Sequence, residues 1–278
     1  MAKKIIGAGK WKAKVLFCGD HSTYKANLTI EHDPDLYIKL PYLAFLLTDG
    51  EMNVLIDNGM NDRFIIDGKA WANCPCNSGA QYFLDSLAKE GLKPDDIDLI
   101  LYTHLHNDHA GNCNFFPKTK SIAQYDEWQN LLDPNFSERR RRDYDLDVIP
   151  YLRNNPNFYK IDGDAEILEG IKLIKTPGHT RGSQCIVANT VNGVRIFVGD
   201  QFHMGCSFYP WLEEMPDVDG VSHKITAEHE WPTIPSSLIY DYPSYYKSVE
   251  KVRAYVPDIT DTQYVMCGHD PALLFREI

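Results

Sequence analysis

A short stretch at residues 103–111, Thr-His-Leu-His-Asn-Asp-His-Ala-Gly, concentrates side chains that bind metals. Within six positions it holds three imidazoles and a carboxylate, from His104, His106, Asp108 and His109. These groups are good ligands for a borderline divalent metal ion. An apolar, β-rich run at 97–102 leads into the stretch, so it begins where a buried strand should end. Functional groups gather at such strand ends in layered α/β proteins, and the stretch therefore predicts a metal site.

The spacing within this stretch indicates an extended chain. His104 and His106 are two positions apart, so on a strand their side chains lie on the same side. They cannot share a helical face, which excludes the H-E-x-x-H arrangement of helical metalloproteases. A lone histidine is more often structural. Packing four such groups together without a cation, however, would cost desolvation and leave a charge unpaired, so we favour metal binding.

Three more ligand-type side chains follow apolar, β-rich runs. They are His179 after the run at 171–176, Asp200 after the run at 194–198 and His269 after the run at 264–266. With His104, four predicted strands end on a ligand type. Asp57 ends a fifth run, where it could orient a ligating histidine or merely cap a turn, and we favour the first role.

Hairpins and a helix are expected to frame these strand ends. The segments 36–57 and 185–198 each consist of two β-rich runs around a turn dipeptide, Asp-Gly and Asn-Gly, and predict hairpins. Ser78 is expected to cap a helix with an apolar stripe at helical spacing. His21 and His32 stand alone in a polar loop and are expected to be ordinary surface or hydrogen-bonded residues.

The composition limits the classes of protein. With 278 residues, 44% hydrophobic and 24% charged, and no linker-like stretch, we predict a single domain over residues 1–278. The net charge of −11 argues against nucleic acid as a partner. No apolar run approaches the roughly 18 residues of a membrane span, so no membrane partner is expected. The seven scattered cysteines suit a reducing, cytoplasmic location.

The motifs taken together resemble the metallo-β-lactamase superfamily. The matching segments are H-x-H-x-D-H at 104–109, T-P-G-H-T at 176–180, V-G-D at 198–200 and C-G-H-D at 267–270, with I-D-N-G at 56–59 where D-T-G is usual. The resemblance spans roughly residues 40 to 275. It implies an α/β fold, a four-layer αββα sandwich, with a two-metal site at one edge of the paired sheets.

The resemblance also implies seven ligands for two divalent metal ions. The first ion would be held by His104, His106 and His179. The second would be held by Asp108, His109 and His269, and Asp200 would bridge both. Zinc is the expected metal, and Mn, Fe or Co are the alternatives, because histidine and carboxylate ligands without thiolate suit all four.

Within the superfamily the chain is similar to the N-acyl-homoserine lactonases and their pyridoxolactonase-like relatives. Those lactonases commonly place a tyrosine three residues after the bridging aspartate, where it polarises the substrate carbonyl. Here that position holds His203. We predict that His203 contacts a carbonyl or oxyanion, the alternative being a hydrogen bond within its own loop. Asp108 is the second predicted catalytic residue and would carry a proton to the leaving group.

The segment 201–242 is longer than a simple connection needs. It holds five aromatic residues that we predict to bind substrate: Phe202, Phe208, Tyr209, Trp211 and Trp231. Long loops without obvious secondary structure often serve as lids or binding loops. We therefore predict a lid that walls the metal site with aromatic surface and suits a compact ring substrate. The alternative is that these aromatics form a local core that keeps the segment folded.

Two reactions suit the predicted site. The first is the opening of a small cyclic ester, a lactone, by a hydroxide that bridges the two metals. The second is the hydrolytic cleavage of a carbon–carbon bond in a cyclic 1,3-diketone, for which His203 and the aromatic segment give a reason. A redox di-iron protein is a less favoured interpretation, and a non-catalytic metal-binding module is the remaining one. The expected partner is a small cyclic molecule, and an exposed aromatic lid could also form a homo-oligomer interface.

Overall fold

Two β-sheets form the centre of the protein in the computed structural model, which describes residues 9–278. The larger sheet has the strand order β4-β1-β2-β3-β5-β6-β7 and the smaller one the order β14-β11-β10-β9-β8. The strands of the larger sheet are β1 (Lys12–Tyr24), β2 (Tyr37–Thr48), β3 (Asn53–Ile56), β4 (Cys76–Ser78), β5 (Leu99–Leu101), β6 (Lys120–Gln124) and β7 (Phe158–Ile161). Those of the smaller sheet are β8 (Ala165–Leu168), β9 (Ile171–Lys175), β10 (Gln184–Thr190), β11 (Gly193–Gly199) and β14 (Val265–Cys267).

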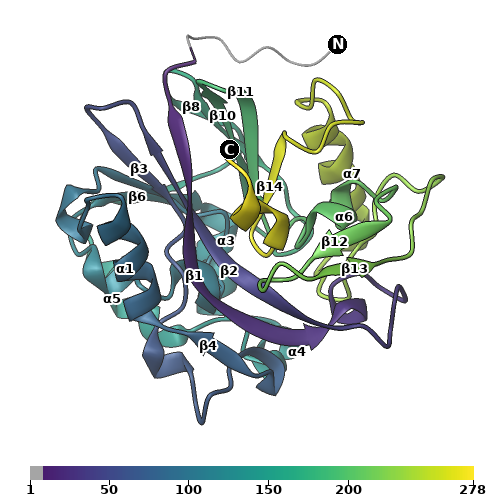
Figure 1. Ribbon diagram of the computed structural model, residues 1–278. Helices are drawn as coiled ribbons and strands as arrows, with labels where there is room; N and C mark the ends of the chain where they lie inside the picture. Colours follow the sequence, from purple (N-terminus) through teal and green to yellow (C-terminus); the bar gives the residue numbers. More distant parts are fainter. Residues whose placement is uncertain (1–8) are drawn as a thin grey trace.

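Helices cover the outer faces of both sheets. In Figure 1, α1 and α5 lie on one side of the sheets and α7 on the other. The helices are α1 (Ala80–Lys89), α2 (Asn107–Ala110), α3 (Tyr125–Leu132), α4 (Phe136–Arg141), α5 (Ile149–Asn154), α6 (Gly205–Phe208) and α7 (Tyr242–Arg253). Short 3-10 helices span Lys25–Asn27, Asp62–Phe64, Trp71–Asn73, Pro94–Asp96, Cys113–Phe115, Leu146–Val148 and Pro271–Phe275.

Successive side chains of β2 point alternately into the two apolar cores on either side of the larger sheet. Phe45 and Leu47 belong to the core between the two sheets, where the Phe45 ring lies 4.9 Å from the ring of Phe197 on β11. Ala44 and Leu46 face the opposite way, into the core that the larger sheet forms with its helices. The side-chain period of two thus gives β2 two apolar faces.

The outer face of the smaller sheet is covered by α7. Tyr245, Val249 and Val252 of this helix pack in one cluster with side chains of β10, β11 and β14. The Asp241 carboxylate accepts a hydrogen bond from the Ser244 amide and caps the first turn. Helix, sheet, sheet and helix follow one another, and the predicted αββα sandwich is confirmed.

Local predictions from the sequence have mixed outcomes. The two hairpins are confirmed, because β2 pairs with β3 and β10 pairs with β11 in antiparallel register. The prediction that Ser78 caps a helix is wrong. Ser78 ends β4 and its hydroxyl donates to the Cys18 carbonyl, while the Asp62 carboxylate accepts from the amide of Ala80, the first residue of α1.

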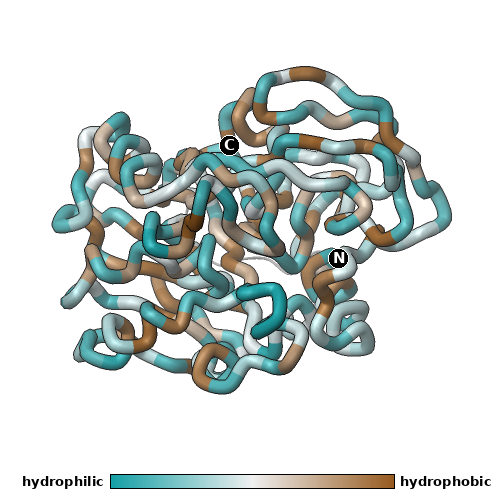
Figure 2. The backbone as a smooth tube through the Cα atoms, turned by 90° about the horizontal axis from the view of Figure 1, so that it is seen from below, coloured by the Kyte–Doolittle hydropathy of each residue, from teal (hydrophilic) through white to brown (hydrophobic). Residues whose placement is uncertain are grey.

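The segment 201–242 is folded against the rest of the protein. It contains α6 and a two-stranded hairpin of β12 (Glu214–Pro216) and β13 (Ser222–Lys224). Met204, Met215 and Ile225 of this segment form a small apolar cluster with Ile38 and Leu40 of β2. Hydrophilic stretches recur along the peripheral loops in Figure 2. No helix within residues 9–278 is long and apolar enough to cross a membrane.

Candidate metal centre

Several strand ends meet at one edge of the paired sheets. β3 runs parallel to β5, and β11 runs parallel to β14, so the carboxyl ends of each pair lie together. Such edges are where α/β proteins hold their functional groups. The predicted ligands follow β5 (His104, His106), lie on α2 (Asp108, His109), or follow β9 (His179), β11 (Asp200) and β14 (His269).

The structure gathers all seven predicted ligands into two groups that share Asp200. One group is His104, His106, His179 and Asp200, and the other is Asp108, His109, Asp200 and His269. Within each group, one ligand atom per residue lies within 4.8 Å of the others. Six of the seven side chains are buried and Asp108 is partly exposed.

The spacing of the ligand atoms fits coordination of cations. Oδ1 of Asp200 lies 3.2 Å from His109 Nε2 and 3.1 Å from His269 Nε2, and its Oδ2 lies 3.6 Å from His179 Nε2. His106 Nδ1 and His179 Nε2 are 3.2 Å apart. Ligand atoms that lie roughly 2.0–2.2 Å from a tetrahedral ion are about 3.3–3.6 Å from one another. The donor set therefore fits two metal ions.

Asp57 holds two of the histidines in a fixed orientation. Its carboxylate accepts from His109 Nδ1 at 2.8 Å and from Thr103 Oγ1 at 2.7 Å. Because the Thr103 hydroxyl donates to Asp57, it accepts from His104 Nδ1, 3.0 Å away. Both imidazoles are thus engaged through Nδ1, and Nε2 of each is buried without a hydrogen-bond partner. Asp57 itself has a positive φ of 59°, a conformation that costs a non-glycine residue energy and clusters at functional sites.

Gly268 allows β14 to approach the other ligands closely. A Cβ atom at this position would lie 2.9 Å from Asp200 Oδ1 and 3.0 Å from His109 Cε1. The next residue, His269, donates from Nδ1 to the Pro41 carbonyl at 2.9 Å, so its Nε2 faces Asp200. The absence of a side chain at Gly268 therefore lets three ligands converge.

The pKa values of the histidines are shifted in opposite directions in the two ligand groups. Burial alone would lower the pKa of His109, but the charges of Asp200 and Asp108 raise that pKa well above its usual value. The pKa of His269 is also raised, against burial, by Asp200 and Asp108. Burial and the neighbouring imidazoles lower the pKa of His104 well below its usual value. A cation must therefore compete with protons in the half that holds His109 and His269.

Glu127 of α3 links the two histidine motifs, and no motif in the sequence indicates this role. Its buried carboxylate accepts from the Leu105 amide and the Tyr144 hydroxyl, each at 2.9 Å. It also accepts from the Thr180 hydroxyl and from the Gly182 amide. Leu105 lies within the first histidine motif and Thr180 within the second. Only the tertiary fold brings these donors to one carboxylate.

A cavity of about 410 Å³ opens onto the ligands. It is lined by five of them and by His21, Leu28, Tyr42, Trp71, Asn107, Asp143, His203 and Leu238. The predicted catalytic residue His203 thus lies in this cavity. Its Nε2 is buried without a hydrogen-bond partner, 3.3 Å from Asp200 Oδ2, and its ring stacks on that of His269 at 5.7 Å.

Residues that the sequence did not single out complete the cavity. His21 was expected to be an ordinary surface or hydrogen-bonded residue, but it is buried, lacks a hydrogen bond at Nδ1 and stacks on Tyr42. Trp71 donates from Nε1 to Asp143 Oδ1 at 3.0 Å. None of these residues belongs to a motif, so no pattern in the sequence marks them. His32 is hydrogen-bonded, as expected.

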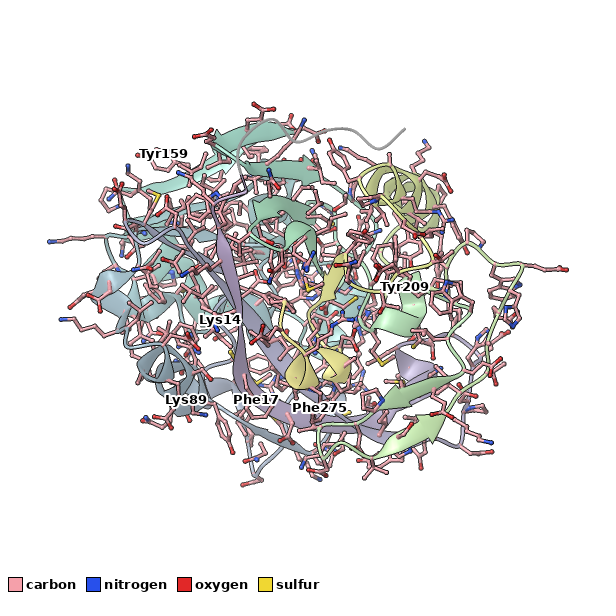
Figure 3. All side chains as sticks on the ribbon, turned by 45° about the horizontal axis from the view of Figure 1, so that its top comes forward. Lys14, Phe17, Lys89, Tyr159, Tyr209 and Phe275 are labelled. Atoms are coloured by element: carbon pink, nitrogen blue, oxygen red, sulfur yellow. The ribbon has the colours of Figure 1, made fainter. Side chains whose placement is uncertain are left out.

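The five aromatic residues that we predicted to bind substrate do not line this cavity. Phe202, Phe208 and Tyr209 are buried in the cluster that α7 forms with the smaller sheet, Trp211 packs against it and Trp231 is exposed. Figure 3 shows Tyr209 on the α7 side of β14. The prediction of an aromatic wall from this segment is therefore wrong, because most of these rings form the local core. The segment reaches the cavity through His203 and Leu238.

Comparison with known proteins places the chain in a family. Residues 37–269 match the model of the Metallo-beta-lactamase superfamily, and the chain belongs to this superfamily. An N-acyl homoserine lactonase of Bacillus thuringiensis is 31% identical over 179 residues, which are 62% of this chain and 66% of that protein. The N-acyl homoserine lactonase AiiB of Agrobacterium fabrum is 24% identical over 245 residues, 84% of this chain and 80% of that protein.

Solved structures show the same fold. An N-acyl homoserine lactone hydrolase with the product N-hexanoyl-L-homoserine bound at its catalytic metal center has a TM-score of 0.71 at 22% identity, covering 95% of this chain and 94% of that one. AidC, a dizinc quorum-quenching lactonase, has a TM-score of 0.69 at 18% identity, covering 96% and 90%. The chain spans 66% of the length of the Bacillus thuringiensis relative.

Proposed function

We propose that the protein is a dinuclear-metal-dependent hydrolase that opens the ring of a small lactone. The observation that carries this proposal is the sharing of Asp200 by two His/Asp groups at the floor of one cavity. The similarity to N-acyl homoserine lactonases supports the same reaction class. The cavity that opens onto these groups is lined by both polar and apolar side chains, as sites for small molecules are.

The metal ions would be held by the seven ligands of the two groups. Two divalent cations bound there would supply Lewis acidity and a nucleophile at neutral pH. Asp57 and Glu127 would keep the ligating loops in place, since they bond to both histidine motifs. We infer zinc as the resident metal, with Mn, Fe and Co as the alternatives that elemental analysis of the purified protein would distinguish.

His203 would bind the carbonyl group of the substrate. Its Nε2 lies in the cavity wall without a hydrogen-bond partner, and a donor at that position stabilises negative charge that develops on a carbonyl oxygen. Asp108 would carry a proton to the leaving oxygen. Its side chain is partly exposed and lines the cavity, where a leaving group would lie within its reach.

The second candidate reaction is the cleavage of a carbon–carbon bond in a cyclic 1,3-diketone. One observation favours it: both His21 and His203 line the cavity and each has a buried ring nitrogen without a hydrogen-bond partner. A 1,3-diketone presents two carbonyl oxygens, one for each imidazole. The leaving group would then be a carbanion, which Asp108 would protonate.

Two further properties remain our inferences. We infer a cytoplasmic location, which the seven unpaired cysteines support. The inferred partner is a small cyclic molecule.

The test is proton release in a pH-stat, under anaerobic conditions, with metal-reconstituted protein. The panel holds acyl-homoserine lactones, simple γ- and δ-lactones, aromatic lactones and cyclic 1,3-diketones, and Asp200→Ala is the blank. Lactone turnover that vanishes in the blank is the expected result. Turnover of diketones alone would establish the second candidate. If the fully metallated protein turns over no substrate of the panel, both candidate reactions are contradicted.

A further inference from the structure

Asp143 joins two parts of the cavity that lie far apart in the chain. Its side chain is buried, and Oδ1 accepts a hydrogen bond from Trp71 Nε1, 3.0 Å away. Its main-chain carbonyl accepts from the Asn107 amide at 2.9 Å and from Nδ2 of the same residue at 2.8 Å. All three residues line the cavity. Asp143 therefore bonds to the cavity wall through its carboxylate and to the first histidine motif through its carbonyl.

Asn107 lies between ligands that belong to different groups. His106 belongs to one of the two ligand groups and Asp108 to the other, and we call residues 106–108 the ligand loop. Asn107 is buried, and its Nδ2 also donates to the Arg142 carbonyl at 3.0 Å. Three hydrogen bonds thus hold the ligand loop against two consecutive carbonyl groups. Because the main chain is continuous through Asn107, a displacement of these carbonyls moves a ligand of each group.

The chain around Asp143 is fixed by contacts of its own. Arg142 ends α4 in the left-handed conformation, with φ of 62° and ψ of 45°, which costs a non-glycine residue energy. The Arg141 guanidinium binds the Asp143 carboxylate, with Nε 3.0 Å and a terminal nitrogen 2.6 Å from Oδ2. The ring of Tyr144 meets that of His106 edge-on, with centroids 4.6 Å apart. Such charge-assisted pairing limits rotation of the Asp143 side chain, so Asp143 can transmit a displacement.

Trp71 lies on a strained turn that is closed by a local hydrogen bond. The Cys74 amide donates to the Trp71 carbonyl at 2.9 Å. Between these residues Ala72 and Asn73 have φ values of 48° and 64°, both left-handed. Backbone of this kind persists only where the surrounding contacts over-determine it. The bond from Trp71 Nε1 to Asp143 is such a contact, and it ties the turn to the side of the cavity that holds the ligand loop.

We infer that Asp143 is a positioning residue that couples Trp71 in the cavity wall to the ligand loop. A displacement of the Trp71 ring is transmitted through the carboxylate and the carbonyl of Asp143 to Asn107. The ligands on either side of Asn107 move with it, so the cavity wall and the metal centre adjust together. The inference rests on the two-metal centre of the proposed function and does not depend on the identity of the substrate.

The test is a double-mutant cycle followed by the binding of cobalt(II), whose visible absorption reports the geometry of its ligands. Trp71→Phe keeps a ring in the wall but removes the donor to Asp143. Asn107→Ala removes the side-chain bonds to two carbonyls. Trp231→Phe is the matched control, because Trp231 is exposed and does not line the cavity. The thermal stability of each metal-free variant is also measured.

Trp71→Phe should change the cobalt absorption bands and lower cobalt affinity by about fivefold, less than the loss expected for a group that bonds to a ligand directly. In the Asn107→Ala background the same substitution should lower affinity by less than about twofold, because the connection is already weakened. Trp231→Phe should leave affinity and spectrum unchanged. Effects of Trp71→Phe and Asn107→Ala that multiply, or a wild-type affinity and spectrum in Trp71→Phe, would overturn the inference.

A fluorescence measurement tests the coupling in the opposite direction and needs no change in the ligand loop. Coupling between two sites is reciprocal, so zinc that fixes the ligand loop should reduce the quenching of Trp71 by acrylamide. The Trp71 signal is the difference between wild type and Trp71→Phe. Quenching of Trp71 that stays constant or rises on zinc loading would overturn the inference.

Neither measurement requires turnover, which keeps the inference separate from the proposed function. If no lactone is hydrolysed, the proposed reaction fails, yet a cobalt spectrum that responds to Trp71→Phe and zinc-dependent quenching of Trp71 would still support the role of Asp143. If lactones are hydrolysed and both readouts are unchanged, the proposed reaction stands and the coupling is refuted.

Discussion

Asp57 Oδ2 and His109 Nδ1 lie 2.8 Å apart and join the end of β3 to the short helix α2. The same carboxylate accepts from the Thr103 amide at 2.8 Å, just beyond the end of β5. One residue therefore fixes the orientation of His109 and the path of the chain into His104. The position of the ligands depends on groups that never touch a metal.

Replacing Asp57 should weaken metal binding while every ligand stays in place. Asp57→Asn puts an amide nitrogen where one carboxylate oxygen accepts, so His109 loses its fixed tautomer. We expect metal affinity to fall by about 10- to 100-fold, measured by competition with a chelator. Asp85→Asn, on the exposed side of α1, is the control. Equal affinities for Asp57→Asn and wild type would contradict this role.

Replacing Glu127 should lower stability even without metal. Glu127→Ala removes the acceptor of the Leu105 amide, the Tyr144 hydroxyl and the Thr180 hydroxyl. We expect the free energy of unfolding of the metal-free protein, from urea denaturation, to fall by about 2–3 kcal/mol. Glu166→Ala, at the exposed position of β8, should change it by less than about 0.5 kcal/mol. Matching losses in the two variants would show that the network does not stabilise the fold.

Stabilisation by metal should grow with pH. The raised pKa values of His109 and His269 mean that protonation stabilises the metal-free fold. That stabilisation is complete below the unfolded pKa of about 6.5 and is lost as the pH rises through the folded values. Bound metal displaces these protons, so its effect is smallest in acid. The gap in Tm with and without chelator should widen from about pH 5 to about pH 9, and a constant gap would contradict the assignment.

A methyl group at Gly268 should disturb the ligands directly. In Gly268→Ala the new Cβ atom would lie 2.9 Å from Asp200 Oδ1, closer than side chains tolerate. We expect metal affinity to fall by about tenfold or more. Gly50→Ala is the control, since its φ is +92° but no atom lies within 4 Å of its added Cβ. It should lower Tm without changing metal affinity, and a wild-type affinity for Gly268→Ala would refute the close approach.

The sequence predicted the parts of the site that are local in the chain. The ligands each follow a β-rich run, and the structure places all seven at the predicted edge. Glu127, His21 and Trp71 escaped prediction because each acts through a neighbour that is distant in the chain. The prediction that the aromatic residues of 201–242 line the cavity was wrong because composition alone does not tell whether a ring faces a cavity or a core. Phe202 and Phe208 pack in the core beneath α7. His21 lines the cavity because a bulge in β1 changes the face of the sheet on which its side chain lies, and no sequence motif indicates that bulge.

The most direct test of the central claim is metal stoichiometry followed together with lactone hydrolysis. Metal-free protein is loaded stepwise, and bound metal and proton release are measured on the same samples. The account predicts two equivalents per chain, activity that depends on the second, and one equivalent in the double variant His104→Ala/His106→Ala. Saturation of the wild type at a single equivalent with full activity would contradict a centre in which Asp200 joins two ions.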